Sequence, residues 1–403
     1  MELSGQFYDV IIVGAGPAGS YVAYELSSSG YNVAVFEQKN APGLDICCTG
    51  IISTECFQSM DPGTAVILTE INSARFFSPS GKCLNLQTEK VQAYVANRPL
   101  LDKTIASKAQ SQGAQYLFSS PVIDIIPRKD NIQVEASCFG DRKIFSARAV
   151  VLANGFMPRL PWKLGLGKIK NFLVGAQGEV EARNLDKPEI YFGQEIAPGA
   201  FAWLVPTGVG TSTNKAHAGL LAISHARLHL QKFLNNLFGQ GRIISREVKI
   251  EQKIIPVGTP SRSYGDRVLV VGDAAGQVKP TTGGGIYFGH LGAKIAAKVL
   301  DEALSSNNLT AAQLSRYQKR WKAKIGKELS LGYRARQAYI KLSDRQIEEL
   351  FTALGSSGMA EALLRSDGFS FDWHSRLILA GLKYSSTYPL LKIKQLVSRE
   401  AGS

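Results

Sequence analysis

The chain has 403 residues, of which 45% are hydrophobic and 20% are charged, and this ordinary globular composition argues against a disordered protein. No stretch approaches roughly 18 uninterrupted apolar residues, and the first residues lack the features of a secretory signal, so we expect neither a membrane-spanning helix nor export. The net charge of +13 fits a basic soluble protein, and also one that meets nucleic acid, an anionic membrane surface or an anionic substrate.

The five cysteines include no CxxC pair and no Cys/His spacing typical of a metal site. We therefore expect no disulfide framework and no metal, and a cytoplasmic protein, with a peripheral position at the membrane as the alternative. Many of the excess cations gather between Arg316 and Arg345, without a known nucleic-acid motif. This cluster favours a surface that faces lipid or phosphate over one that faces nucleic acid.

The first predicted elements form a strand, a turn, a helix and a second strand. Residues 10–13 (VIIV) are an apolar run typical of a buried parallel strand, and residues 18–28 have helical spacing. The turn between them reads GAGPAG. Gly14 permits the tight turn, Gly16 lets the backbone approach a pyrophosphate, and Gly19 lets the helix pack closely on the strand.

The helix that begins near Ala18 offers free N–H groups and the positive end of its dipole to phosphates. The second strand, NVAVFE, ends at Glu37 with Gln38 beside it, where a carboxylate can accept hydrogen bonds from ribose hydroxyls. Strand, glycines, helix and terminal acid together predict a dinucleotide site, for FAD or for NAD.

Two later strands also end in glycine turns. The strand within AVVLANGF, residues 149–156, leads to Asn154-Gly155, and RVLVV at 267–271 leads to Gly272-Asp273. A glycine-rich loop at 283–285 and a helix to about Leu300 follow the second of these strands. Arg98 and Asp102 stand at the start of another predicted helix.

These segments resemble the flavin-binding motifs of FAD-dependent oxidoreductases of the hydroxybenzoate-hydroxylase superfamily. The resemblance implies that Asp273 hydrogen-bonds the ribityl chain of FAD and that Arg98 lies near the pyrophosphate. It also places the backbone of Gly284, Gly285 and Ile286 against the pyrophosphate and the flavin. Because no second GxGxxG is present, NAD(P)H or a reduced ferredoxin-type carrier is expected to bind only transiently.

Two stretches resemble the geranylgeranyl reductase family more narrowly. CCTGII at 47–52 resembles a loop that brings a cysteine near the flavin, with Cys48 in that place, Cys47 as its neighbour, and Thr49 and Gly50 on the substrate side. FAWLVP at 201–206 resembles the family's Y-x-W-x-F-P signature, a strand that lines a tunnel for a prenyl chain. Its matching residues are Phe201, Trp203 and Pro206.

The resemblance implies a reductase that hydrogenates geranylgeranyl-type double bonds by hydride transfer from N5 of reduced FAD. The substrate would be a hydrophobic isoprenoid, with or without an anionic head group, and Cys48 would be a candidate proton donor, since thiols are mostly protonated at neutral pH. The alternatives are an FAD-dependent monooxygenase, a flavoprotein that passes electrons to a membrane quinone, and a flavin-binding protein without activity.

We therefore expect an α/β protein in which a Rossmann-like FAD-binding domain carries an inserted antiparallel β-sheet substrate domain and a C-terminal helical region. The predicted FAD-binding segments are 1–70, 98–160 and 258–310, and the substrate domain is 71–97 and 161–257. Residues 311–403 are expected to be helical, and the basic and apolar stretch at 373–397 either covers the core or lies on a membrane surface.

Overall fold

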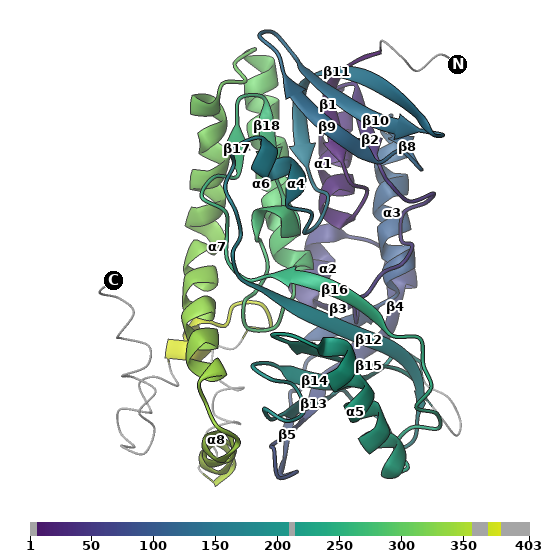
Figure 1. The fold of residues 1–403 in the computed structure, drawn as a ribbon, viewed down its shortest axis with the longest axis vertical. Helices are drawn as coiled ribbons and strands as arrows, with labels where there is room; N and C mark the ends of the chain where they lie inside the picture. Colours follow the sequence, from purple (N-terminus) through teal and green to yellow (C-terminus); the bar gives the residue numbers. More distant parts are fainter. Residues whose placement is uncertain (1–5, 209–213, 357–369, 380–403) are drawn as a thin grey trace.

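The computed structural model describes residues 6–208, 214–356 and 370–379 (Figure 1). Within them the chain forms two large sheets, a small third sheet, and a set of helices that cover their faces. The long helix α7 (Ala311–Ile340) runs alongside both large sheets. This arrangement confirms the predicted α/β class with a Rossmann-like sheet and an antiparallel sheet beside it.

The first sheet has eight strands around a parallel centre in the order β18, β11, β1, β2 and β8. An edge strand, β17, and the pair β9 and β10 join it in antiparallel fashion. The strands are β1 (Phe7–Val13), β2 (Val33–Phe36), β8 (Gln115–Leu117), β9 (Val122–Pro127), β10 (Ile132–Cys138), β11 (Asp141–Leu152), β17 (Tyr264–Gly265) and β18 (Val268–Val270).

Both faces of this sheet are buried, which explains why its central strands are apolar throughout rather than alternating. Ile12 and Val35 face the helices, and Ile11 and Phe36 face the β9–β10 side. The helices on the first side are α1 (Pro17–Ser28), α3 (Arg98–Ser111), α6 (Ile286–Ser305) and α7, and the short α4 (Arg159–Lys163) covers the second side.

The second sheet has seven strands in the order β16, β12, β15, β14, β13, β5 and β6. All neighbours are antiparallel except β13 and β5, which run parallel. The strands are β5 (Ser73–Phe77), β6 (Cys83–Gln87), β12 (Phe172–Ala182), β13 (Glu189–Phe192), β14 (Phe201–Pro206), β15 (Asn214–Ala222) and β16 (Glu251–Pro256). Helix α5 (Ala226–Gly239) packs on its outer face, and α8 (Asp344–Ser356) packs against β5 and β6.

A three-stranded sheet links the two large sheets and contains β3 (Ile51–Ser53), β7 (Ala93–Ala96) and β4 (Ile67–Ile71). Helix α2 (Thr54–Met60) and the 3-10 turns η1 (Thr64–Val66) and η2 (Gly272–Ala275) complete the elements. Residues 71–97, assigned from sequence to the substrate domain, are therefore divided between the seven-stranded sheet and this small sheet.

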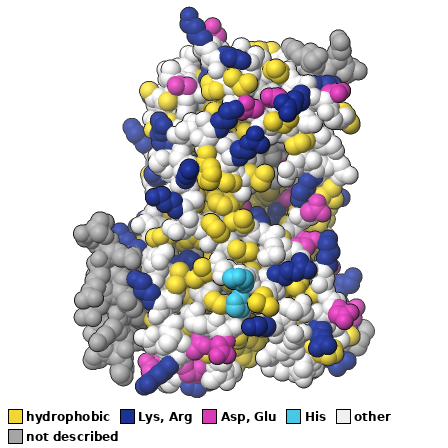
Figure 2. Space-filling model, in the orientation of Figure 1, with side chains coloured by type: hydrophobic (Ala, Val, Ile, Leu, Met, Phe, Trp, Pro, Cys, Tyr) yellow, Lys and Arg dark blue, Asp and Glu magenta, His cyan; other side chains and the backbone are white. Residues whose placement is uncertain are grey.

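Among the described residues, no helix is both long enough and apolar enough to cross a membrane. Lys and Arg side chains are spread over the face drawn in Figure 2, with acidic side chains between them. Most of the basic and apolar stretch at 373–397 lies outside the described residues.

Candidate functional site

The carboxyl ends of four neighbouring parallel strands meet at one edge of the eight-stranded sheet. β1 is followed by Gly14, β2 by Glu37, β11 by Ala153, and β18 by Val271 and then Gly272. The Gly14 N–H donates to the Phe36 carbonyl at 2.8 Å, which ties the first two turns together. In open α/β sheets this edge is where ligands bind.

The three glycines of GAGPAG occupy unlike environments. A Cβ at Gly14, where φ is +106°, would lie 2.5 Å from the Ala153 carbonyl oxygen, and a Cβ at Gly19 would lie 2.1 Å from the Gly14 oxygen. Gly14 and Gly19 are therefore required by packing. No atom lies within 4 Å of a Cβ built at Gly16, so Gly16 keeps a space open at the start of α1.

Glu37 fastens the glycine turn to the second strand. Its carboxylate accepts a hydrogen bond from the Ala15 N–H at 2.8 Å and another from the Lys39 N–H at 3.0 Å. Each carboxylate oxygen has a second lone pair, so Glu37 can still accept from a ribose hydroxyl. Gln38 beside it is exposed.

The turn after β18 packs directly on the first glycine motif. A Cβ at Gly272 would lie 3.3 Å from the Ala18 Cβ, so Ala18 sets the distance between α1 and η2. Asp273 forms an ion pair of 2.9 Å with Lys253 of β16. A Cβ at Gly285 would lie 2.6 Å from Asp273 Oδ1, so the glycine-rich loop passes close to this carboxylate. The attraction of Asp273 raises the pKa of Lys253 against the opposing effect of burial.

Backbone bonds fold the glycine-rich loop into a compact turn before α6. The Gly283 N–H donates to the Lys279 carbonyl at 2.8 Å, and the Lys279 N–H donates to the Gly284 carbonyl at 3.0 Å. Helix α6 then begins at Ile286, and neither its N-cap, Gly285, nor that of α1, Gly16, forms a side-chain cap.

These features fit FAD. Two helices without side-chain caps begin at the same sheet edge, and such N-termini favour phosphate oxygens. The space at Gly16 is open, and Arg98 has a buried Nε with no hydrogen-bond partner within the described part of the chain. Gly16, Arg98, Asp273 and the Gly284–Ile286 backbone would hold the cofactor.

The cysteine loop lies between this edge and the seven-stranded sheet. Arg98 forms an ion pair with Asp102 at 2.7 Å. Burial lowers the pKa of Arg98, but the opposing effects of Asp102 and then of Cys48 are larger together, so the pKa is raised. Cys48 also raises the pKa of Lys253, after the larger effects of Asp273 and burial. The Cys48 thiol is therefore near two cations that lie far from it in sequence.

The neighbours of Cys48 fasten the loop to the seven-stranded sheet. The Cys47 Sγ donates to the Glu251 carbonyl of β16 at 3.6 Å, and burial, followed by Cys48, raises its pKa to about 11. The Thr49 hydroxyl donates to the Gln177 side chain of β12 at 2.8 Å. Both cysteines are free thiols, and Gly50 is buried with φ of +82°.

An apolar and aromatic wall faces the glycine-rich loop. Phe201 and Trp203 of β14, with ring centroids 5.9 Å apart, pack in one cluster with Leu221 of β15. A Cβ at Gly283 would lie 3.0 Å from Leu221 Cδ1, so the wall and the loop are in contact. Pro206 is buried at the end of β14 and lies outside this cluster.

Comparison with known proteins agrees with this geometry. The digeranylgeranylglycerophospholipid reductase of Methanocaldococcus jannaschii is 32% identical over 363 residues, which cover 87% of this chain and 91% of the relative. The family model described as lycopene cyclase protein matches residues 9–355. The chain belongs to the geranylgeranyl reductase family.

Other members of the geranylgeranyl reductase family are similar over the same length. The digeranylgeranylglycerophospholipid reductase 2 of Methanothermobacter thermautotrophicus is 32% identical and covers 86% of this chain and 91% of its own. The crystal structure of a geranylgeranyl bacteriochlorophyll reductase-like protein from Thermoplasma acidophilum superposes with a TM-score of 0.82 at 23% identity, and the match covers 97% of this chain and 99% of that one. This superposition confirms the fold.

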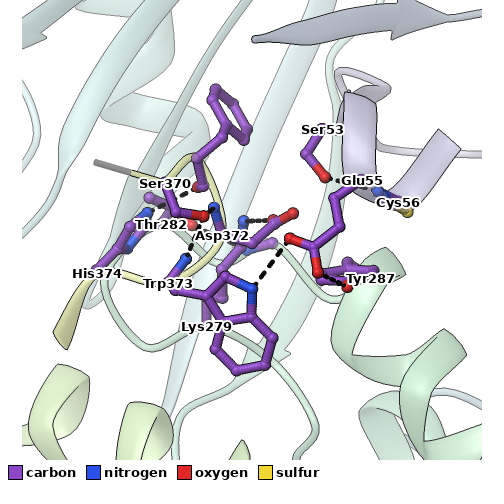
Figure 3. A network of polar contacts seen from close by, with 12 residues as sticks. Ser53, Glu55, Cys56, Lys279, Thr282, Tyr287, Ser370, Asp372, Trp373 and His374 are labelled. Atoms are coloured by element: carbon purple, nitrogen blue, oxygen red, sulfur yellow. Dashed lines mark hydrogen bonds and ion pairs between the residues drawn. The ribbon is translucent and has the colours of Figure 1, made fainter. Parts of the chain in front are cut away.

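Residues 370–375 form a C-terminal latch over the glycine-rich loop (Figure 3). The buried Lys279 donates to Asp372 at 2.6 Å, and the Thr281 hydroxyl lies 2.7 Å from His374 Nδ1. On the other side of the latch, the Trp373 indole donates to Glu55 at 3.1 Å, and the Tyr287 hydroxyl of α6 donates to the same carboxylate.

Four residues at this site were not predicted from the sequence: Lys253, Lys279, Asp372 and Glu55. Each belongs to a different segment, and the ion pair between Lys279 and Asp372 spans more than ninety positions. No local spacing signals such a pair. The one available signal was weak: Lys279 stands inside the flavin-like motif, where a lysine must be either solvated or paired.

Proposed function

We propose that this member of the geranylgeranyl reductase family is an FAD-dependent oxidoreductase that hydrogenates carbon–carbon double bonds of geranylgeranyl-type isoprenoids. The observation that supports it best is the contact between the aromatic wall and the glycine-rich loop, at Leu221 and Gly283. The aromatic wall, which offers a surface for a hydrophobic chain, thus adjoins the residues suited to FAD. The relatives named as reductases of digeranylgeranylglycerophospholipid agree with this assignment.

Reduced FAD would supply the hydride for an unactivated alkene. The protein's contribution is to hold the chain and to exclude water. An isoprenoid offers only apolar surface along its length, and burying it releases about 25 cal/mol per Å². The rings of Phe201 and Trp203 provide broad apolar contact for this purpose.

Hydrogenation also needs a proton, and the cysteine loop can provide one. We assign Cys48 as the proton donor and Cys47 as its neighbour. Because burial raises the pKa of Cys47 to about 11, that thiol keeps its proton at neutral pH. The cations beside Cys48, Arg98 and Lys253, would stabilise the thiolate left after proton transfer.

The electron donor is NAD(P)H or a ferredoxin-type carrier, which would bind transiently. Exposed cations along α7, such as Lys322 and Lys324, suit either a carrier with acidic residues or the surface of an anionic membrane. A peripheral position at the membrane would bring the enzyme to lipid substrates.

The test is anaerobic. The FAD-loaded protein is reduced with dithionite, geranylgeranyl diphosphate or a geranylgeranyl lipid is added, and flavin absorbance and product mass are followed. We expect reoxidation of the flavin and a product heavier by two hydrogens. Cys48→Ser should slow the reaction at least about tenfold, whereas Cys83→Ser, an exposed thiol on β6, should not change it.

Three outcomes would contradict the proposal. A product of unchanged mass would indicate cyclisation or isomerisation, in line with the lycopene cyclase model that also matches the chain. Flavin that stays reduced until oxygen is added, with an oxygenated product, would indicate a monooxygenase. Flavin that is reoxidised by a quinone and not by an isoprenoid would indicate electron transfer to a membrane quinone.

A further inference from the structure

Among the residues that the structure describes, Arg336 of α7 is a buried cation without a hydrogen-bond or ion-pair partner. Only 6% of the surface of Arg336 is exposed, and its side chain forms no hydrogen bond and no ion pair in the described part of the chain. Two other cations that are buried in the described ranges each have a carboxylate: Arg98 is paired with Asp102, and Lys279 with Asp372.

Arg336 lies on the side of α7 that faces both the aromatic wall and the segment 280–281, which leads into the glycine-rich loop. One turn earlier, a Cβ at Gly332 would lie 3.2 Å from Pro280 Cδ. Tyr333 packs in the cluster of Phe201 and Trp203, and the Tyr339 hydroxyl donates to the Ala200 carbonyl at 2.8 Å. Residues three and four apart share a helix face, so Arg336 lies between these contacts.

A buried guanidinium without an anion is costly, because the charge has lost its hydration and gained nothing in return. Burial lowers the pKa of Arg336 to about 10, so the group is still charged at neutral pH. Its nitrogens are not among the fully enclosed polar atoms, in contrast to Arg98 Nε. The group is therefore placed to receive an anion from outside the protein.

We infer that Arg336 binds the phosphate oxygens of the substrate's head group. This inference rests on the proposed function. An isoprenoid chain is a hydrocarbon, so its head group is the part that can supply an anion, and the planar fork of arginine suits phosphate oxygens in bidentate fashion. Because the head group would be fixed beside the wall, Arg336 would also determine which double bond lies at the cofactor site.

The test compares Arg336→Met with Arg334→Met, an exposed arginine on the same helix. Methionine keeps the apolar stem and leaves no unpaired charge, so folding and FAD content should be unchanged. Three substrates are used: geranylgeranyl diphosphate, a digeranylgeranylglycerol phosphodiester, and neutral geranylgeraniol. We expect Arg336→Met to raise KM for at least one phosphate-bearing substrate about tenfold or more, without changing KM for geranylgeraniol.

The substrate with the larger increase in KM identifies the source of the phosphate, a free diphosphate or a lipid. Equal effects on all three substrates, or none, would overturn the inference, as would the same loss in Arg334→Met.

A binding measurement separates this inference from the proposed function. Inorganic pyrophosphate should raise the Tm of the FAD-loaded wild type and of Arg334→Met, but not that of Arg336→Met. If the wild type reduces none of the substrates, the proposed function fails, and this Tm difference still decides whether Arg336 binds an anion. Equal Tm shifts in all three proteins would refute the anion site.

Discussion

At Gly219 a glycine makes room for a tryptophan on the neighbouring strand. A Cβ there would lie 2.5 Å from the Trp203 ring, so the indole lies directly on the backbone of β15. The Trp203 Nε1 is buried without a hydrogen-bond partner within the described residues. The position of the Trp203 ring in the aromatic wall therefore depends on glycine at position 219, because any larger residue there would collide with the ring.

We expect Gly219→Ala to displace Trp203 and to lower kcat/KM for an isoprenoid about tenfold, because a displaced ring would position the substrate less well. The overpacking should also lower the free energy of unfolding by about 1–3 kcal/mol. FAD content should be unchanged. The measurement is steady-state kinetics with geranylgeranyl diphosphate. Gly239→Ala, at the end of α5 with no atom within 4 Å of the added Cβ, is the control. Unchanged kinetics in Gly219→Ala would show that the position of Trp203 is not critical.

The glycines of the first motif allow folding and cofactor binding to be tested apart. Gly16→Val adds a side chain in open space, so the Tm of the apoprotein should change little while FAD affinity falls at least about tenfold. Gly19→Val, whose Cβ would lie 2.1 Å from the Gly14 oxygen, should prevent stable folding. FAD titration and thermal unfolding measure the two effects. Normal FAD binding by Gly16→Val would show that the cofactor does not approach this turn.

At the scale of elements, the latch joins the C-terminal region to the glycine-rich loop. Besides the contacts of Lys279 and Thr281, the Ser375 N–H donates to Glu328 of α7 at 2.9 Å, so α7 also supports the latch. Lys279 has two roles: its side chain meets Asp372, and its backbone closes the turn at Gly283. Loss of the latch should therefore disturb the loop.

Asp372→Asn leaves the Lys279 charge buried with a neutral partner, and such losses cost about 3–5 kcal/mol. We expect a lower free energy of unfolding in urea and weaker FAD binding. Lys279→Met combined with Asp372→Leu removes both charges and should recover much of the stability, because apolar residues can replace a buried pair. If the double variant is as unstable as Asp372→Asn, the damage comes from lost packing of the latch rather than from the charge.

At the scale of the whole molecule, the buried His290 and the half-buried His374 make stability depend on pH. Burial, followed by the effect of Lys294, lowers the pKa of His290 to about 4. Burial, followed by that of Lys279, lowers the pKa of His374 to about 4. Neutral His374 accepts from the Thr281 hydroxyl and donates to the Phe371 carbonyl at 2.9 Å. Protonation at Nδ1 would reverse the first of these bonds, with the Thr281 hydroxyl as acceptor, and would place a positive charge close to Lys279.

The sign of the effect follows from proton uptake. Between the unfolded pKa of about 6.5 and the folded pKa of about 4, the unfolded chain binds more protons, so stability falls as pH falls. Each histidine contributes a slope of up to about 1.4 kcal/mol per pH unit. Urea unfolding at pH 7, 6 and 5 measures it, and the slope should be smaller in His290→Gln. An equal slope in that variant would assign the effect to other groups.

The sequence alone predicted the parallel strands at the centre of the eight-stranded sheet and the family. Apolar strands that end in glycines are local patterns, and their chemistry is the same wherever the chain places them. The position of Gly16 at the start of a helix followed from such patterns, and the aromatic residues of β14 followed from the resemblance to the family.

Only the tertiary structure decided which distant residues meet. The pairs of Lys253 with Asp273 and of Lys279 with Asp372, and the seat of Trp203 on Gly219, join segments with no common period or spacing. The division of residues 71–97 between two sheets likewise depends on strand pairing. Burial makes such contacts important for stability, because a charge removed from water needs a partner. That Arg336 has no such partner among the described residues could be seen only once its neighbours were known.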